Sequence, residues 1–594
     1  MDIIALIVGP IVKTLQNARS TKELWAGSYL FSYLMREIIL HLGDKKFYLP
    51  NPEATKVPLN KYYGAGTFPD VLIFESEKPD EELKELEEII NQVLKQFAQD
   101  MIRHFMMLPG KKQLSINGVE EFVRAYFNFH GIKISLPNSG IGEAISIAKH
   151  HLSVQELQEA WMQTEKVNRR DNSKKVFQNY LDTYFSTIHR SALFKKIFDD
   201  ENLGKYDFLK EIYTEKDKIL EKRGQGRDDI KVGFPSTRDI ASFEIFEKVQ
   251  KEGGQTRDSY IELMADALIL DEEGKQKGRE ERYFESMGIL RDKDDIKLLE
   301  PYHKYICIVY GDGDGLSNII GKLDNYDAYK GFNKKLGQFR QSAAETINEY
   351  GGKPVYIGGD DFLFFTPVKS QKGTVFDLIE QLQRDFNNLQ LENSPTLSFG
   401  ISISYHKFPL FESVEIARSL LNDKAKEFKA GNKTKNAVAI RLTKHSGTYF
   451  EVVLNKAQET FKQLRKLSKS FVNADAYLSS LLFKVKDNET LLQDLFVTAK
   501  EKENYDRFGQ YFDNFFNENI HQGEKGEAFK TALKDLLIAV FKEFGYTPGE
   551  IPDELTDTQK KELLEKPIRI FYSIVRLAHF MTPKNVKIDE PVNA

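Results

Sequence analysis

The sequence predicts an α+β protein in which the segment order β-α-β-β-α-β occurs once in full and once as an imperfect echo. Three observations support this prediction. An apolar, β-rich run at 305–310 leads into an acidic loop, a second apolar run at 355–365 is broken by Gly-Gly-Asp-Asp, and the first 107 residues alternate strands and helices in a similar order. This order is that of a ferredoxin-like domain. We therefore expect two ferredoxin-like domains, one of them degenerate, and two helical domains.

The degenerate domain is expected over residues 1–150. Residues 3–8 read as a strand, Gly9-Pro10 as a turn, and 11–42 as a helix. A Gly-rich loop ending at Asp70 leads into a second strand at 71–74, and a long helix follows at 79–107. No acidic pair follows the first strand, so this domain is expected to form half of a substrate pocket without a metal site.

Residues 151–300 are expected to be mostly helical and charged, with a helix at 238–250 capped by Ser236 or Thr237. Three basic pairs, at 169–170, 174–175 and 195–196, are typical of solvated helix faces, with an RNA-facing surface as the alternative. Residues 446–594 are also helical, and their aromatic residues at spacings of three and four predict a core stripe rather than a base-stacking platform. Those aromatic residues are Phe508, Tyr511, Phe512, Phe515 and Phe516.

The complete domain is expected over residues 301–445. Its first strand ends in Gly-Asp-Gly-Asp-Gly at 311–315, and a helix begins near Leu316-Ser317. A helix at about 332–349 leads to a hairpin with strands at 355–357 and 362–365. A further strand at 397–404, a helix at 414–428 and a closing strand at 437–442 complete the domain.

The hairpin turn Gly358-Gly359-Asp360-Asp361 carries two adjacent carboxylates at the end of apolar strands. Such a pair is costly without a positive partner, and Mg²⁺ or Mn²⁺ with a nucleotide phosphate is the obvious one. An ordinary acidic turn is the alternative. In a ferredoxin-like sheet the end of the first strand lies beside this turn, so Asp312 is expected to converge with Asp360 and Asp361. Three carboxylates at one place favour a metal site for phosphoryl or nucleotidyl transfer.

Bulk composition narrows the classes of protein. The net charge of −5 argues against a chain that coats nucleic acid everywhere, although it allows a local basic channel. The single cysteine, Cys307, excludes a disulfide framework and a zinc ribbon within this chain. No apolar run reaches the roughly 18–20 residues that span a bilayer, and the N-terminus has no basic region of a signal peptide. We expect a cytoplasmic protein without zinc and without a membrane partner.

Several motifs together resemble a known family. They are the acidic loop at 311–315, the Gly-Gly-Asp-Asp hairpin, Ala18-Arg19 and Trp25 to Ser28 near the N-terminus, 233–237, and 435–440. The set resembles the large polymerase-cyclase subunit of type III CRISPR effector complexes in its Cmr (III-B) form. The resemblance implies two nucleotidyl cyclase-like palm domains, and other Cmr subunits, guide RNA and target RNA as partners. It also implies a C-terminal helical domain that contacts neighbouring subunits.

The resemblance further implies a site that binds ATP and transfers AMP, with Asp312, Asp360 and Asp361 as catalytic and metal-binding residues. Other residues expected to contact the ligand or the metal shell are Gly313, Asp314, Ser317, Gly358, Gly359, Lys426 and Lys435. The acceptor is a second ATP, giving cyclic oligoadenylate, or S-adenosylmethionine, giving an AMP conjugate. Many relatives carry an Asn-Arg pair where this chain has Asp70, and a carboxylate there suits the ammonium of an amino-acid-like substrate. A turn-forming Asp after Pro69 is the alternative.

The sequence has no His-Asp dipeptide, which relatives with an HD nuclease domain carry, so no DNase activity is expected. Three other functions share some of these features: a stand-alone nucleotidyl cyclase, a template-dependent polymerase, and a catalytically silent structural subunit. The first would normally have a single palm, and the second would need a basic groove. The third would have no need to keep uncompensated carboxylates together.

Overall fold

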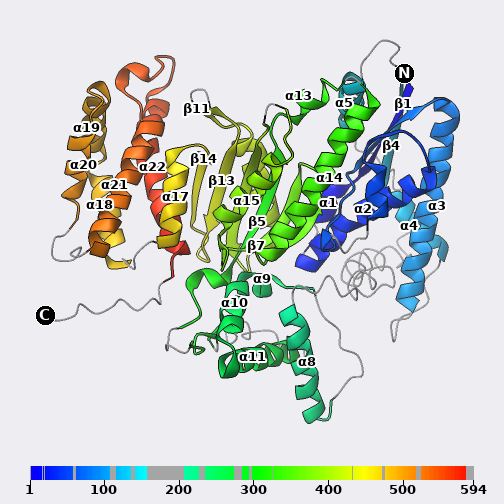
Figure 1. Ribbon diagram of the computed structural model, residues 1–594, viewed down its shortest axis with the longest axis horizontal. Coiled ribbons are helices and arrows are strands. Elements are labelled where there is room, and N and C mark those ends of the chain that lie inside the picture. The colour runs from blue at the N-terminus through cyan, green and yellow to red at the C-terminus, as the bar shows by residue number, and fades with distance from the viewer. Residues whose placement is uncertain are drawn as a thin grey trace, which may run out of the picture.

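The computed structural model in Figure 1 describes residues 2–583. Within that range it leaves out 17, 19, 58–61, 107–115, 136–140, 157–206, 226–233, 273–283, 286, 293–296, 324, 393, 431–432, 471–474 and 517–523. The basic pairs at 169–170, 174–175 and 195–196 lie outside the described residues. The second palm domain occupies the centre of the molecule, the first palm and the C-terminal helices flank it on opposite sides, and a small helical region lies below it (Figure 1).

The first palm is a four-stranded antiparallel sheet in the order β2-β3-β1-β4. Its strands are β1 (Asp2–Gly9), β2 (Phe47–Leu49), β3 (Val71–Ser76) and β4 (Asn128–Ser135). Its helices are α1 (Ile11–Gln16), α2 (Thr21–Leu42), α3 (Pro79–Met106), α4 (Ile116–Tyr126) and α5 (Ile141–Glu156), with a 3₁₀ turn at Pro52–Lys56. The strand order is that of a ferredoxin-like domain, which confirms the predicted fold.

One helix of this palm differs from the sequence prediction. The helix expected over 11–42 is two helices, because α2 begins anew after Ser20, whose hydroxyl accepts a hydrogen bond from the amide of Glu23. A side-chain cap of this kind satisfies an amide that would otherwise lack a partner at the helix start. Helix α2 then buries Trp25, Leu34 and Ile38 against the sheet.

The second palm has a six-stranded sheet in the order β14-β13-β10-β5-β7-β6. Its strands are β5 (Tyr305–Gly313), β6 (Lys353–Ile357), β7 (Phe362–Pro367), β10 (Leu397–Tyr405), β13 (Ala437–Thr443) and β14 (Tyr449–Asn455). The core order β10-β5-β7-β6 is again ferredoxin-like, as predicted. Beyond these four strands, the predicted closing strand β13 pairs in parallel with β10. Strand β14, which the sequence did not predict, pairs with β13 in the antiparallel direction.

Helices cover this sheet and connect its strands. They are α13 (Leu316–Ile320), α14 (Tyr326–Glu349), α15 (Val375–Asn387) and α16 (Leu410–Ser419), with a 3₁₀ turn at Pro301–Lys304 before β5. The short ribbons β8 (Lys369–Ser370) with β9 (Gly373–Thr374), and β11 (Lys429–Ala430) with β12 (Lys433–Thr434), lie in the loops. The helix predicted at 414–428 ends earlier as α16 and continues as the π-helical turn η6 (Leu420–Ala425), which carries the chain to Lys426.

The two palms are joined by residues 62–70, which we call the inter-palm segment. It belongs to the first palm but lies along β6 of the second. The Gly66 amide donates to the Val355 carbonyl at 3.0 Å, and the Ile357 amide donates to the Gly66 carbonyl at 2.8 Å. The segment therefore acts as a short parallel strand at the edge of the second sheet, and it leads directly into Asp70.

Most of the remaining described residues are helical. The middle region contains α8 (Asp207–Lys222), α9 (Thr237–Ala241), α10 (Phe243–Glu252) and α11 (Gly254–Glu272). The predicted helix at 238–250 is split at Ser242 into α9 and α10, and Ser236 caps its start with Asp239 in a reciprocal pair of hydrogen bonds. A buried cluster joins α10 to the second palm, since Glu244 accepts hydrogen bonds from Tyr302 and His303.

The C-terminal region contains six helices among its described residues. They are α17 (Glu459–Ser470), α18 (Asp475–Asp487), α19 (Glu489–Glu501), α20 (Asp506–Asp513), α21 (Glu524–Phe544) and α22 (Asp557–Met581), with a 3₁₀ turn at Pro548–Glu550. Phe508 and Phe512 are fully buried, so the aromatic stripe is core, as predicted. Within the described chain, no helix combines the length and the apolar character needed to cross a membrane.

Candidate active site

A cavity of about 640 Å³ lies between the two palms. Residues around Pro50 and Asp70 line it from the first palm, and residues of α13, α14 and the hairpin line it from the second. The sequence-predicted site residues found on its wall are Asp70, Asp312, Gly313, Ser317, Gly358, Asp360, Asp361, Lys426 and Lys435. Its volume is in the range of sites for small molecules.

The carboxylates of Asp312, Asp360 and Asp361 come together because β5 and β7 are neighbouring strands. Gly311 at the end of β5 pairs with Phe362, the first residue after the hairpin turn. The turn is closed by the Gly358 amide, which donates to the Asp361 carbonyl at 2.9 Å. Asp360 lies so close over the acidic loop that a Cβ on Gly313 would be 2.9 Å from its Oδ2 atom. The predicted convergence is therefore present.

The negative charge of each of these carboxylates makes ionisation of its neighbours less favourable. Burial in the cavity wall raises the pKa of Asp360 to about 6, and the charge of Asp312 adds to this rise. Burial and the charge of Asp360 also raise the pKa of Asp361 well above its ordinary value. Asp360 is partly exposed and Asp361 is exposed, and both side chains line the cavity. Water confined in the cavity screens the charges of these two carboxylates less than bulk water would. The cluster therefore favours a bound cation.

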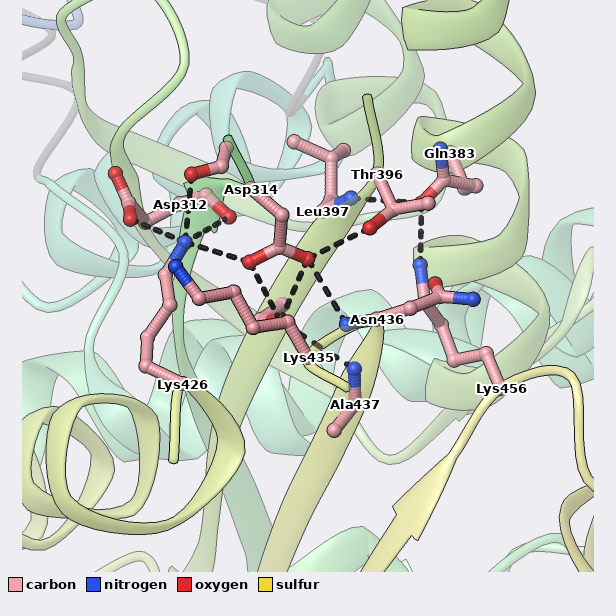
Figure 2. Close-up of polar contacts among 12 residues, drawn as sticks. Asp312, Asp314, Gln383, Thr396, Leu397, Lys426, Lys435, Asn436, Ala437 and Lys456 are labelled. Carbon is pink, nitrogen blue, oxygen red and sulfur yellow. Dashed lines mark hydrogen bonds and ion pairs between the residues drawn. The ribbon is translucent and has the colours of Figure 1, made fainter. Parts of the chain in front are cut away.

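Lys426 forms ion pairs with two carboxylates of the acidic loop, Asp312 and Asp314. Its Nζ atom is 2.5 Å from Oδ2 of Asp312 and donates to the carbonyl of Gly313 at 2.6 Å and to Oδ1 of Asp314 at 2.8 Å. Figure 2 shows the lysine pointing into the acidic loop from the turn that follows η6. The pKa of Asp312 is nevertheless raised, because burial outweighs the opposing effect of Lys426. Lys426 thus holds the acidic loop in place.

Asp314 is 7% exposed and does not line the cavity. Its carboxylate accepts hydrogen bonds from the hydroxyls of Thr396 and Ser398, at 2.7 and 2.8 Å, and from the amide of Asn436 at 3.0 Å (Figure 2). These partners come from the starts of β10 and β13. Asp314 therefore ties three strands together beneath the acidic loop and positions the loop rather than the ligand.

Lys435 reaches the cavity from a bend in the backbone. Lys435 and Asn436 have φ angles of 52° and 45°, a region that side chains other than glycine rarely adopt. The bend is held because the Asn455 side chain donates to the Lys435 carbonyl at 2.7 Å, and the Lys456 amide donates to the Asn436 carbonyl at 2.8 Å. Lys456 is itself buried and donates to Gln383 at 2.5 Å (Figure 2). The end of β14, a strand that the sequence did not predict, thus stabilises the backbone bend that places Lys435 on the cavity wall.

Asp70 faces the carboxylate cluster from the first palm. Its backbone is fixed because the Val8 amide donates to the Asp70 carbonyl at 2.9 Å, and its charge contributes to the raised pKa of Asp361. The two predicted halves of the pocket therefore meet at this point.

Two basic residues on the cavity wall were not predicted. Lys149 comes from α5, and its charge opposes the rise in the pKa of Asp360. Arg340 comes from α14 and is 4% exposed. Neither lies in a recognisable motif, and their place on the wall depends on the packing of the two palms. Gly359, which was predicted, does not line the cavity but has a φ of 152° within the turn.

The carboxylates on this wall are the residues that would hold a divalent metal. Among the described residues, no three His, Cys, Asp or Glu side chains are arranged as a ready set of metal ligands. Asp312 is instead paired with Lys426. The donor set still fits Mg²⁺ or Mn²⁺, because these ions prefer carboxylate oxygens and would relieve the repulsion that raises the pKa values of Asp360 and Asp361. Metal binding would require Asp312 to exchange Lys426 for the ion.

Two families of known proteins match parts of this chain. The family described as "Cas10/Cmr2, second palm domain" matches residues 305–439, and the family "CRISPR-associated protein Cmr2, N-terminal" matches residues 3–103. The "CRISPR system Cmr subunit Cmr2" of Pyrococcus furiosus is 34% identical over 115 residues, which cover 19% of this chain and 13% of that protein. The aligned part is thus a small fraction of the length of that relative.

Two solved structures have a similar fold. A type III-B Cmr-beta structure in the apo state matches with a TM-score of 0.53 and 11% identity over 83% of this chain and 75% of the other. Type III-B Cmr-beta bound to cognate target RNA matches with a TM-score of 0.51 and 12% identity, over 96% and 83%. Both palms and the acidic hairpin thus lie where the family matches fall: residues 3–103 match the Cmr2 N-terminal family, and residues 305–439 match the Cas10/Cmr2 second palm domain.

Proposed function

We propose that this chain is the adenylyl-transferring subunit of a type III-B CRISPR complex. It binds ATP and, when target RNA is bound, transfers AMP to an acceptor with release of pyrophosphate. The observation that carries the proposal is the convergence of Asp312, Asp360 and Asp361 on one wall of a cavity shared by both palms. Three mutually repelling carboxylates beside a cavity of about 640 Å³ are costly to maintain without a metal–nucleotide ligand.

Each residue has a role in this chemistry. Asp312, Asp360 and Asp361 would hold Mg²⁺ or Mn²⁺, which lowers the barrier by neutralising charge on the phosphates. Gly313 and Gly358 leave room for the carboxylates, since a Cβ at these positions would lie 2.9 Å from Asp360 Oδ2 and 2.5 Å from Asp361 Oδ1. Lys435 and Lys149 supply positive charge from opposite palms for the triphosphate. Ser317 lines the same wall.

In the reaction a hydroxyl of the acceptor attacks the α-phosphorus of ATP. A new P–O bond forms, the bond to the β-phosphate oxygen breaks, pyrophosphate leaves, and the hydroxyl proton passes to solvent. The acceptor is another ATP, giving cyclic oligoadenylate, or S-adenosylmethionine, giving an AMP conjugate. Asp70 supports the second acceptor, because a carboxylate at the first-palm side of the cavity repels a triphosphate and attracts an ammonium.

The partners follow from the same proposal. The similar structures are of Cmr-beta complexes, one with cognate target RNA, and we propose that this chain likewise assembles with other Cmr subunits, a guide RNA and a target RNA. We place it in the cytoplasm, where such a complex would meet its target.

The experiment incubates the assembled complex with target RNA, ATP, S-adenosylmethionine and Mg²⁺, and identifies the products by mass spectrometry. The wild type is expected to release pyrophosphate and form an adenylylated product, and Asp360→Ala combined with Asp361→Ala is expected to abolish it while the complex still assembles. Product formation by the double variant would show that the metal assignment is wrong. Oligoadenylate as the sole product would exclude the conjugate.

A further inference from the structure

Asn333 places a buried side-chain amide on the wall of the cavity between the two palms. It lies in α14 and is 8% exposed. Its Nδ2 atom donates to the carbonyl of Tyr48, in β2 of the first palm, at 3.0 Å. Among the residues that the structure describes, no hydrogen bond reaches its Oδ1 atom. Buried amides normally satisfy their acceptor as well as their donors, so this oxygen requires a partner from the cavity.

The orientation of the Asn333 amide is fixed by its neighbours. A backbone carbonyl only accepts hydrogen bonds, so the atom that faces Tyr48 is the amide nitrogen. A second contact agrees with this orientation. Burial raises the pKa of the Tyr329 hydroxyl, and an interaction with the Asn333 side chain opposes that rise, as a hydrogen-bond donor does. Because the nitrogen is held by protein groups, Oδ1 remains as an acceptor for a ligand.

The cavity wall around this amide is mostly apolar. The wall residues nearest in sequence to Asn333 and to its anchor Tyr48 are Tyr329, Phe332, Leu336, Leu49 and Pro50. An apolar wall with one fixed polar atom is typical of sites for small molecules, in which the polar atom sets the orientation of the ligand. Such a wall suits a flat heteroaromatic ring with a hydrogen-bonding group on its edge.

Leu336 connects this wall to the carboxylate cluster. A Cβ on Gly359, in the hairpin turn, would lie 3.7 Å from Cδ1 of Leu336. Asn333 is on the same face of α14 one turn earlier, about 5 Å along the helix axis. The charge of Asp360 also acts on the hydroxyl of Tyr329, the neighbour of Asn333. A nucleotide whose phosphates lie at the carboxylates would therefore extend its base along α14 toward Asn333.

A fixed acceptor distinguishes the two purine bases. Adenine carries an amino group at C6, which donates hydrogen bonds, whereas guanine carries a carbonyl oxygen there, which only accepts them. Oδ1 of Asn333 would pair with the amino group and repel the carbonyl oxygen. The amide cannot turn over to present its nitrogen instead, because this would break its hydrogen bond to Tyr48. A site of this kind rejects a ligand without the donor, since its own polar atom is then left unpaired.

We propose that Asn333 selects adenine by accepting a hydrogen bond from the 6-amino group of the base. This inference rests on the proposed function, since it specifies how the chain recognises the base of the ATP that donates AMP. It concerns the base alone and leaves the acceptor of the transfer open. Asn333 determines specificity and takes no part in the bond changes at the α-phosphorus.

Asn348 provides a matched control. It is the same residue type in the same helix, it is 6% exposed, and it is not on the cavity wall. Replacing either asparagine by leucine removes one buried amide from α14. General weakening of the helix would therefore appear in Asn348→Leu as well as in Asn333→Leu. A second variant, Asn333→Ala, removes the same amide without overfilling the site.

The test measures binding by calorimetry on the purified full chain in Mg²⁺ without RNA. The probes are ATP, GTP, CTP and purine riboside triphosphate, which has hydrogen in place of the 6-amino group of ATP. Wild type is expected to bind ATP about 10- to 100-fold more tightly than purine riboside triphosphate, and GTP no better than the latter. Asn333→Leu and Asn333→Ala should bind ATP and purine riboside triphosphate within about threefold of each other, whereas Asn348→Leu should keep the wild-type ratio.

Four results would overturn the inference. These are failure of wild type to prefer ATP over purine riboside triphosphate, an unchanged preference in both Asn333 variants, loss of the preference in Asn348→Leu, and binding of CTP as tight as that of ATP. The proposed function fails on a different readout, namely the absence of pyrophosphate release from ATP by the assembled complex. Pyrophosphate release without a preference for the 6-amino group would remove Asn333 from base recognition and leave the adenylyl transfer in place.

Discussion

Replacing Asp360 by Asn is expected to stabilise the metal-free protein while abolishing its response to Mg²⁺. Burial and the charge of Asp312 raise the pKa of Asp360 to about 6 from an ordinary value of 3.8. At about 1.4 kcal/mol for each pK unit, this difference corresponds to about 3 kcal/mol against the ionised form. Because the side chain is partly exposed to the cavity, water reduces the effect, and we expect about 1–2 kcal/mol.

The sign follows from proton linkage. The folded protein binds the Asp360 proton more tightly than the unfolded chain does, so the stability associated with that proton is fully present below pH 4. It is lost as the pH rises from about 4 to about 6, where the folded carboxyl ionises. Asn imitates the protonated carboxyl at every pH. The variant should therefore match wild type at pH 4 and exceed it above pH 6.

The assay is thermal unfolding in EDTA and in Mg²⁺ at several pH values. A gain of 1–2 kcal/mol corresponds to a rise of about 2–8 °C in Tm for a cooperative unit of 150–250 residues. Mg²⁺ at 100 times its Kd should stabilise wild type by about 2.7 kcal/mol and leave the variant unchanged. A variant that is no more stable than wild type in EDTA at pH 8 would refute the reasoning that these carboxylates repel one another without metal.

Three further predictions concern the loops around the site. Gly358→Ala should lower the rate of AMP transfer at least about 100-fold, because its Cβ would overlap the Tyr356 hydroxyl and lie 2.5 Å from Asp361 Oδ1. The control Gly549→Ala, where no atom lies within 4 Å of the added Cβ, should keep the wild-type rate in the same pyrophosphate assay. Asp314→Asn should destabilise the protein by about 3 kcal/mol in urea unfolding, because it breaks a buried charged network; an unchanged midpoint would contradict this role. Gly66→Ala should raise hydrogen exchange in the inter-palm segment, because its Cβ would lie 2.7 Å from a serine hydroxyl of α2, and equal protection in both proteins would contradict the close packing.

Much of the fold and the centre of the site could be predicted because their signals are local. The acidic loop and the hairpin each follow an apolar strand, and the ferredoxin-like order alone places Asp312 beside Asp360. Turn chemistry fixed the hairpin, since the Gly-Gly-Asp-Asp sequence fits the closed turn between β6 and β7. The order of strands and helices along the chain, together with the residue types in the turns, was sufficient to predict these features.

The remaining features depend on contacts between distant segments. Lys426 was expected at the triphosphate, yet its ammonium lies in the acidic loop, because η6 carries it back over the end of β5. Arg340 is one charge among many in a long helix, and only the packing of the first palm buries it. Strand β14, which supports the bend at Lys435, carries no motif. No local pattern distinguishes such residues from surface charges.

The inter-palm segment also has a consequence for how the chain can be divided and produced. Strand β6 is the last strand of the second sheet, and unpaired edge strands invite pairing with other chains. In the intact protein, backbone hydrogen bonds at Gly66 cover part of this edge. A second palm expressed without residues 1–150 would expose it, and would be prone to aggregate even with all of its own core. During synthesis the covering segment emerges before the strand it protects, so the edge can be shielded as soon as it forms.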